Sequence, residues 1–160
     1  MKSIKIFSAI VILLSCTFGG CSKKKGCTDT IAFNFDTEAE KDDGSCTYAG
    51  LGGNTTIVAK PQHHNNPIYS QANYRDTAYI KFNSLSFPGD NPSAYDLVIA
   101  GDSGSDHVQI GGLKTGNYYL YMTGLDTTLV FPDQRVKGGI PFLLNQSSGE
   151  VTVVIPVTED

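Results

Sequence analysis

The chain has 160 residues, with 12 basic and 16 acidic side chains, a formal net charge of −4 and no tryptophan. This length allows one domain with a full core and a small appendage. The only basic cluster is Lys23–Lys25, which argues against a nucleic-acid partner because phosphate binding needs grouped Lys and Arg. Helix signals are few, and Gly, Asn, Ser, Thr and Tyr are common, which favours strands joined by tight turns.

Residues 1–20 have the pattern of a secretory signal peptide that is cleaved from the chain. Lys2 and Lys5 form a cationic start, and an apolar run from Ile6 to Leu14 follows. The run is shorter than the roughly 18 residues needed to cross a bilayer as a helix. Removing the two leader lysines leaves 10 basic and 16 acidic side chains, a net charge of −6.

Cys21 directly follows this leader. The segment Phe18–Cys21 resembles the lipobox of bacterial lipoproteins, with Phe where Leu is more common. The resemblance implies that Cys21 is lipidated, that residues 21–25 form a tether, and that the membrane is a partner through the acyl chains. Cys16 is a competing lipidation site, and Cys21 is preferred because the polar Ser22–Lys25 follows it. The other alternative is a secreted protein with an unlipidated cysteine.

The expected location follows from the same resemblance. Ser22 next to the anchor is compatible with sorting to the outer membrane. The absence of Asp or Glu immediately after the anchor favours the periplasmic face over the cell surface. We therefore expect an exported protein, lipid-anchored in the outer membrane.

Cys27 and Cys46 remain once Cys16 is assigned to the leader and Cys21 to the lipid. Export favours their oxidation to a disulfide. The bond would close a small ring and contribute about 3 kcal/mol by restricting the unfolded chain. The alternative interpretations are that the two cysteines are free thiols or belong to a metal–thiolate site.

The cysteines bound an acidic segment, residues 26–48. It contains Gly-Cys-Thr-Asp at its start, Ala-Phe-Asn-Phe in the middle, and Asp-Asp-Gly-Ser-Cys near its end. This resembles a short module of secreted and lipid-anchored bacterial proteins, with Thr30 where the module usually has Pro. The resemblance implies no enzymatic activity.

The carboxylates of this module suggest a hard cation such as Ca²⁺, which takes six to eight oxygen ligands. The candidate ligands are Asp29, Asn34, Asp36, Asp42 and Asp43. Their spacing is not that of an EF-hand loop. The alternative is structural: a turn at residues 42–44 and a helical turn capped by Asp29. No cofactor is required, and Ca²⁺ is the candidate ion.

Residues 55–158 alternate apolar and polar side chains in short runs separated by Gly, Pro, Asn and Asp. This period of two predicts an all-β fold, an antiparallel prealbumin-like or immunoglobulin-like sandwich of about seven strands. The residues expected to share inner faces are Ile57 and Ala59; Ala78, Ile80 and Phe82; Tyr95, Leu97 and Ile99; Val108 and Ile110; Tyr118, Leu120 and Met122; and Val151, Val153, Ile155 and Val157.

The segment His107–Asp126 resembles the strand–turn–strand of carboxypeptidase regulatory-like, prealbumin-related domains. It has an apolar pair, Gly-Leu, a polar turn ending in Gly, and an aromatic strand. The resemblance implies that Leu113 fills the core, Gly116 supplies a positive φ in the turn, and Tyr118 starts the next strand. Such sandwiches host many functions, so the resemblance concerns the fold.

Candidate chemistry outside the acidic module is sparse. His63 and His64 are adjacent, and adjacent residues of an extended segment point to opposite faces, which argues against a shared copper or zinc ion. The alternative is loop histidines bonded to the backbone. Ser103 and His107 could serve a hydrolase, but the segment around Ser103 has the composition of a polar turn. Tyr119 and Tyr121 could form an exposed platform for sugar or peptide, or pack on a neighbouring strand.

The sequence therefore favours a non-enzymatic, membrane-anchored envelope lipoprotein whose sandwich is an interaction or structural module, with an envelope protein as partner. The alternative is a calcium-binding envelope protein that uses the Cys27–Cys46 ring, or less favourably a transition-metal-binding one. The third hypothesis, and the least favoured, is a small hydrolase.

Overall fold

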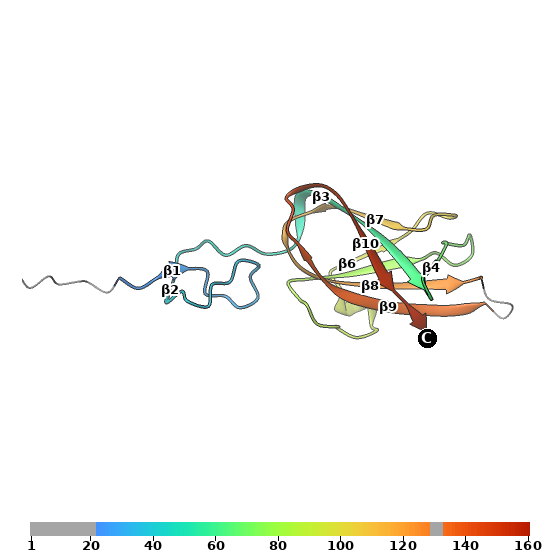
Figure 1. Ribbon diagram of the computed structural model, residues 1–160, viewed down its shortest axis with the longest axis horizontal. Helices are drawn as coiled ribbons and strands as arrows, with labels where there is room; N and C mark the ends of the chain where they lie inside the picture. Colours follow the sequence, from blue (N-terminus) through green and yellow to red (C-terminus); the bar gives the residue numbers. More distant parts are fainter. Residues whose placement is uncertain (1–21, 129–132) are drawn as a thin grey trace, which may run out of the picture.

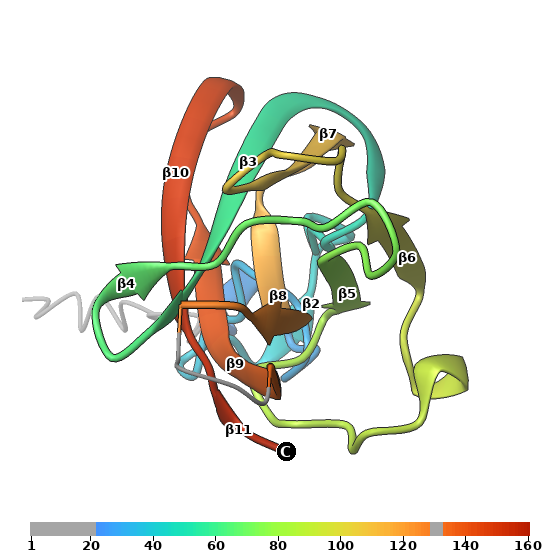
Figure 2. The same ribbon diagram turned by 90° about the vertical axis from the view of Figure 1, so that its right-hand side faces the viewer.

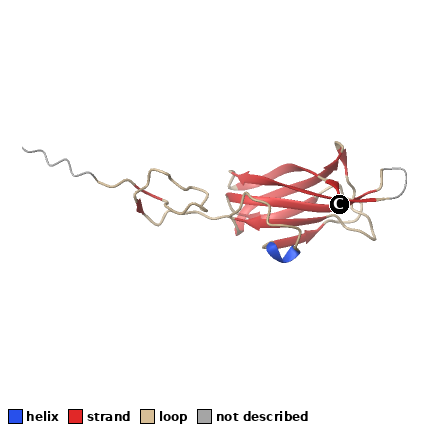
Figure 3. Cartoon of the chain, turned by 90° about the horizontal axis from the view of Figure 1, so that it is seen from below, coloured by secondary structure: helices blue, strands red, loops and turns tan. Residues whose placement is uncertain are grey.

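The computed structural model describes residues 22–128 and 133–160. A small disulfide-closed module precedes a larger β-sandwich, and the two lie end to end, with the C-terminus at the end of the sandwich away from the module (Figure 1). Apart from a 3₁₀ turn at Pro92–Ala94, the described residues form strands and loops (Figure 3). None of their helices is long and apolar enough to cross a membrane. The expected leader, Cys16 and Cys21 lie outside the described residues.

The module has little regular structure. Strand β1 (Lys25–Gly26) pairs in parallel with β2 (Lys41–Asp42), and an isolated bridge joins Cys27 to Phe35. Lys24 already takes part, because its carbonyl accepts hydrogen bonds from the backbone N–H groups of Glu40 and Lys41. The ordered module therefore includes the last residues that the sequence assigned to the tether.

One sheet of the sandwich is built around the long strand β3 (Leu51–His63). It is flanked by β10 (Ser148–Pro156) on one side and β7 (Val108–Leu113) on the other, and β4 (Asn66–Pro67) folds back on its end. The glycine-rich residues 51–54 form the start of β3, where the register with β7 is irregular. The β10–β3 pairing is parallel, whereas the other pairings in this sheet are antiparallel.

The second sheet has the order β11–β9–β8–β5–β6 and is antiparallel in every described pairing. Its strands are β5 (Thr77–Phe82), β6 (Leu97–Ala100), β8 (Gly116–Asp126), β9 (Gln134–Leu144) and β11 (Thr158–Glu159). The chain passes from β10 in one sheet directly to β11 in the other, and Figure 2 shows the two layers seen from the C-terminal end. The predicted all-β sandwich is confirmed.

Apolar side chains from both sheets fill the space between the layers. Most of the residues predicted to face inward do so, and their burial follows the period-two alternation. The buried members of this cluster are Ala49, Ile57, Ala59, Ile68, Ala78, Ile80, Val108, Ile110, Leu113, Tyr118, Leu120, Met122, Val136, Leu144, Val153, Ile155 and Val157.

One expectation for the second sheet was wrong. Tyr95 precedes β6 and packs with Tyr119 and Tyr121 outside the sandwich core, because the 3₁₀ turn before it changes the direction of the chain. Gly116 has the expected positive φ, at 158°, and a Cβ there would also lie 2.6 Å from the backbone of Ala49. Gly112, with φ of 74°, is a second glycine with positive φ in this part of the chain.

The connection between module and sandwich is held by hydrogen bonds. The backbone N–H of Ala49 donates to Asn83 Oδ1 at 2.7 Å, and the backbone N–H of Gly50 donates to the Tyr118 hydroxyl at 3.1 Å. That hydroxyl donates in turn to the carbonyl of Lys114 at 2.6 Å. The chain therefore leaves the module at a defined point on one end of the sandwich.

Candidate functional site

The predicted disulfide between Cys27 and Cys46 is confirmed. Cys27 is 1% exposed and is buried with Ala32 inside the small module. Few other apolar side chains of the module are buried, so the crosslink supplies much of what holds the module together.

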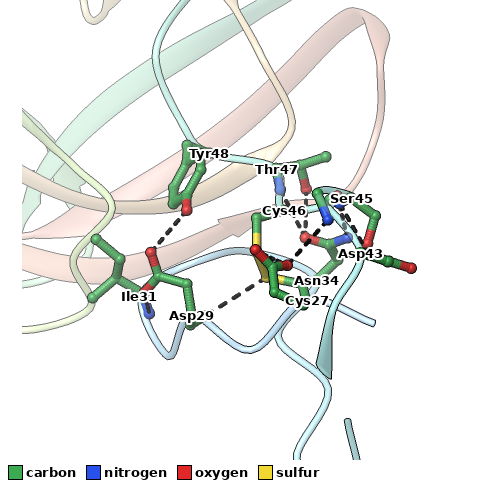
Figure 4. Close-up of a disulfide and its surroundings, with 11 residues drawn as sticks. Cys27, Asp29, Ile31, Asn34, Asp43, Ser45, Cys46, Thr47 and Tyr48 are labelled. Carbon is green, nitrogen blue, oxygen red and sulfur yellow. Dashed lines mark hydrogen bonds between the residues drawn. A yellow bond between two sulfur atoms is a disulfide. The ribbon is translucent and has the colours of Figure 1, made fainter. Parts of the chain in front are cut away.

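Asp29 makes structural hydrogen bonds at the edge of the module (Figure 4). Its Oδ1 accepts from the backbone N–H of Ile31 at 3.1 Å, and its Oδ2 accepts from the Tyr48 hydroxyl at 2.7 Å. The backbone bond and then the tyrosine bond lower the pKa of the Asp29 carboxyl. The side chain therefore joins the two ends of the module.

Asn34, Asp42 and Asp43 organise the second half of the ring. Asn34 Oδ1 accepts from the backbone N–H of Thr47 at 2.8 Å, and its amide donates to the carbonyl of Ser45 at 2.8 Å (Figure 4). Asp42 and Asp43 accept hydrogen bonds from the backbone N–H groups of Gly44 and Ser45, as in Asx turns. The turn that the structural alternative predicted at residues 42–44 is present.

Asp36 is paired with Lys24 at 2.9 Å and accepts the backbone N–H of Glu38 at 2.9 Å. The lysine, and then the backbone bond, lower the pKa of this carboxyl. All five candidate calcium ligands thus serve local structure, and calcium binding by the ring stays a prediction.

The outward face of the second sheet carries an aromatic recess. The recess has a volume of about 260 Å³ and is lined by Phe87, Asp90, Tyr119, Tyr121, Lys137, Gly138, Gly139 and Thr158. Tyr119 and Tyr121 are 8% and 5% exposed, so they are not the open platform that the sequence suggested. The loop between β5 and β6 covers them.

Phe87 is the exposed part of this recess. It is 50% exposed, and its ring centroid lies 5.7 Å from that of Tyr119 and 5.4 Å from that of Tyr121. The Tyr121 hydroxyl donates to Asp90 at 2.7 Å, which fixes the loop over the sheet. Burial, and then this bond to Asp90, raise the pKa of Tyr121.

The serine that contacts His107 is Ser105, not Ser103. Ser105 Oγ lies 3.1 Å from His107 Nδ1, and Asp106 Oδ1 lies 2.8 Å from the same nitrogen. A serine–histidine–carboxylate relay places serine and carboxylate on opposite ring nitrogens. This cluster therefore does not have the arrangement of a nucleophilic triad.

His63 is the last residue of β3 and His64 directly follows it, although extended backbone would place the two side chains on opposite faces. Their rings are stacked, with centroids 4.0 Å apart. His64 and Asn65 both have positive φ, 48° and 65°, so the strand turns before the second histidine and the two side chains come together. Two Asn residues after the histidines were a signal for this turn, because Asn tolerates the left-handed region.

Acidic groups distant in sequence complete this cluster. Nδ1 of His63 lies 2.7 Å from Asp126 Oδ2, and its Nε2 lies 3.4 Å from Glu159 Oε1. Among the described residues, His63, His64 and Glu159 are the one group of three or more His, Cys, Asp or Glu side chains close enough to share a metal ion. Sequence reasoning missed Asp126 and Glu159, since nothing local links them to His63.

Comparisons with known proteins find little. No family model matches the chain, and no curated protein matches it. A crystal structure of a DUF4876 family protein from Bacteroides thetaiotaomicron VPI-5482 is similar over 66% of this chain, with 16% sequence identity and a TM-score of 0.39. The similar region spans 24% of that protein's chain. The resemblance to carboxypeptidase regulatory-like domains stays a prediction.

Proposed function

We propose that this protein is a non-enzymatic lipoprotein of the cell envelope, anchored through Cys21, whose sandwich binds a segment of another envelope protein. The anchor rests on the leader and the cysteine that follows it. The module begins at Lys24, so a lipid on Cys21 holds it close to the membrane, on the periplasmic face of the outer membrane. The sandwich extends from the end of the module opposite β1 (Figure 1).

The aromatic recess is the observation that carries the binding role. Aromatic side chains supply apolar area and a polar tip, and they are enriched where proteins bind partners. At about 260 Å³ the recess is smaller than the roughly 300–1,000 Å³ of typical small-molecule sites. That volume suits one anchoring side chain of a protein segment better than a whole cofactor or substrate.

The recess also offers polar contacts beside the aromatic rings. Lys137 lies 3.4 Å from Asp90, and both side chains retain access to solvent, at 32% and 59% exposure. An extended segment with an apolar side chain flanked by polar groups could use these contacts at the rim. No covalent chemistry is needed for such a role.

Site-specific photocrosslinking tests the proposal. A photoreactive phenylalanine analogue replaces Phe87 in the full chain, and Thr152, exposed on β10 of the other sheet, is replaced in the control. Illumination of living cells should join position 87 to one or a few envelope proteins, and position 152 to none of them. Identical adducts from both positions, or none from position 87, would contradict the proposal.

A further inference from the structure

The hairpin at the C-terminal end of the sandwich brings two histidines to one place. β3 ends at His63 and β4 begins at Asn66, and these two residues are paired in the register. A two-residue loop with positive φ at both positions matches the right-handed twist of the flanking strands. His64, in the left-handed region, therefore lies beside His63 rather than on the opposite face.

His63 is held in one orientation by a buried carboxylate. Its ring is 1% exposed, and Asp126, 2% exposed, lies 2.7 Å from Nδ1. Asp126 Oδ1 accepts two hydrogen bonds from Thr128, and Asp126 Oδ2 faces His63 Nδ1. When Nδ1–H donates to this carboxylate, the lone pair available to a metal ion is on Nε2.

Nε2 of His63 is a buried polar atom without a hydrogen-bond partner. It faces Glu159 Oε1 at 3.4 Å without forming a hydrogen bond. One ligand atom each from His63, His64 and Glu159 lie within 4.8 Å of one another. A buried polar atom without a partner lowers the stability of the fold by about 1–3 kcal/mol, so a ligand that pairs with Nε2 would be favourable.

We propose that His63 Nε2, His64 and Glu159 form a site for a divalent transition metal ion of the zinc class. Ligand atoms at the usual zinc distances in a tetrahedron lie about 3.3 Å apart, close to the 3.4 Å between Nε2 and Oε1. His64 and the Glu159 side chain are exposed and can adjust by rotation. Two histidines and one glutamate leave a fourth position open to water or an external ligand.

Asp126 acts as a positioning residue for this site. Metal-binding histidines commonly donate their other ring N–H to a carboxylate, which fixes the tautomer and increases the basicity of the ligand nitrogen. The hydrogen bond from His63 Nδ1 to Asp126 has this form. A metal ion would also offset the two negative charges, Asp126 and Glu159, that face the histidine pair.

The competing account is a protonated His63 held between Asp126 and Glu159 as an ion pair. In that account Nε2–H faces Glu159 Oε1, a contact of 3.4 Å that is within ion-pair distance but outside hydrogen-bond geometry. The two accounts predict different experimental results, because only the metal site depends on His64 and on added metal.

Titration with Co²⁺, followed by displacement with Zn²⁺, tests the site. The full chain is purified without a histidine tag and treated with chelator. The test variants are His64→Ala and Glu159→Gln, which change exposed side chains, and the matched control is His107→Ala, which removes a histidine elsewhere. Thermal unfolding without metal checks that all variants are folded.

We expect one Co²⁺ per chain with the visible spectrum of a tetrahedral site, displaced by Zn²⁺. Affinity should fall by more than about tenfold in both test variants and stay unchanged in His107→Ala. An absence of Co²⁺ binding would overturn the proposal, as would binding that both test variants retain or that His107→Ala removes. None of these outcomes depends on the lipid anchor or on the aromatic recess.

Discussion

Asp126 and His63 are 63 residues apart in the chain, yet their side chains meet at 2.7 Å inside the sandwich. The contact joins the end of β3 to the end of β8, one strand from each sheet. Asp126 also accepts two hydrogen bonds from Thr128. One carboxylate therefore ties together two layers and the start of the loop after β8.

Replacing Asp126 with Ala should destabilise the fold even without metal. Hydrogen bonds to a charged group contribute about 1.5–3 kcal/mol each, and a buried His63 would lose its partner. We expect the free energy of unfolding in urea to fall by about 3 kcal/mol. Asp102→Ala, on an exposed turn, is the control and should change it little. Equal effects of the two substitutions would show that the buried contact contributes nothing.

Asp76 predicts a pH dependence of stability. It is 1% exposed, and neither side-chain oxygen has a partner in good hydrogen-bond geometry. Burial, partly offset by the nearby backbone N–H of Leu125, raises the pKa of its carboxyl to about 7. Between about pH 4 and pH 7 the folded protein keeps a proton that the unfolded chain releases. Stability should therefore fall as pH rises through this window, by at most about 4 kcal/mol, and level off above it.

The variant Asp76→Asn isolates this contribution because its side chain is neutral at every pH. The difference in unfolding free energy between variant and wild type should shift in favour of the variant from pH 4 to pH 8. Urea unfolding at a series of pH values measures it. A difference that stays constant across the window would mean that Asp76 is ionised in the folded protein.

Reduction of the Cys27–Cys46 bond should unfold the module and leave the sandwich intact. The crosslink restricts the unfolded chain by about 3 kcal/mol, and the module buries few apolar side chains to replace it. With a reductant present, limited proteolysis should cut within residues 27–46 and leave a stable fragment that starts near β3. Equal protection of the module with and without reductant would contradict this expectation.

Gly138, in β9, packs against Pro156 and Val157, where the chain passes from β10 in one sheet to β11 in the other. A Cβ there would lie 2.2 Å from the carbonyl oxygen of Pro156, so backbone must move. We expect Gly138→Ala to lower stability by about 1–3 kcal/mol. In the control, Gly111→Ala, the added Cβ meets Thr56 Oγ1 at an ordinary 3.5 Å. Similar thermal unfolding of the two variants would show that the crossover tolerates the extra atom.

Much of the sandwich could be predicted because alternation is a local signal. Ile80 and Leu120 repeat the period of two within their own strands, and both face the core. The parallel pairing of β10 with β3 could not be predicted. It joins segments separated by about half the chain, and no local turn sequence indicates that they pair. Tyr95 was misplaced because a short 3₁₀ turn changes which face its side chain takes.

The candidate sites show the same division. The disulfide follows from the cysteine count and from export, the turn at Asp42–Gly44 follows from local composition, and the structure has both. The histidine cluster depends on the backbone conformation of His64 and on Glu159, which arrives from the last strand. An extended segment would have separated the two histidines, so a two-residue turn decides whether a metal site can form.

The proposed membrane tether is a lipid on Cys21. Mass spectrometry of the mature protein, purified in detergent from the membranes of a bacterium that expresses the full chain, reports both where the chain starts and whether it carries acyl groups. We expect a chain that begins at Cys21 and carries acyl groups, and Cys21→Ser should abolish both the cleavage and the added mass. A mature chain that starts elsewhere, or that carries no lipid, would rule out this anchor.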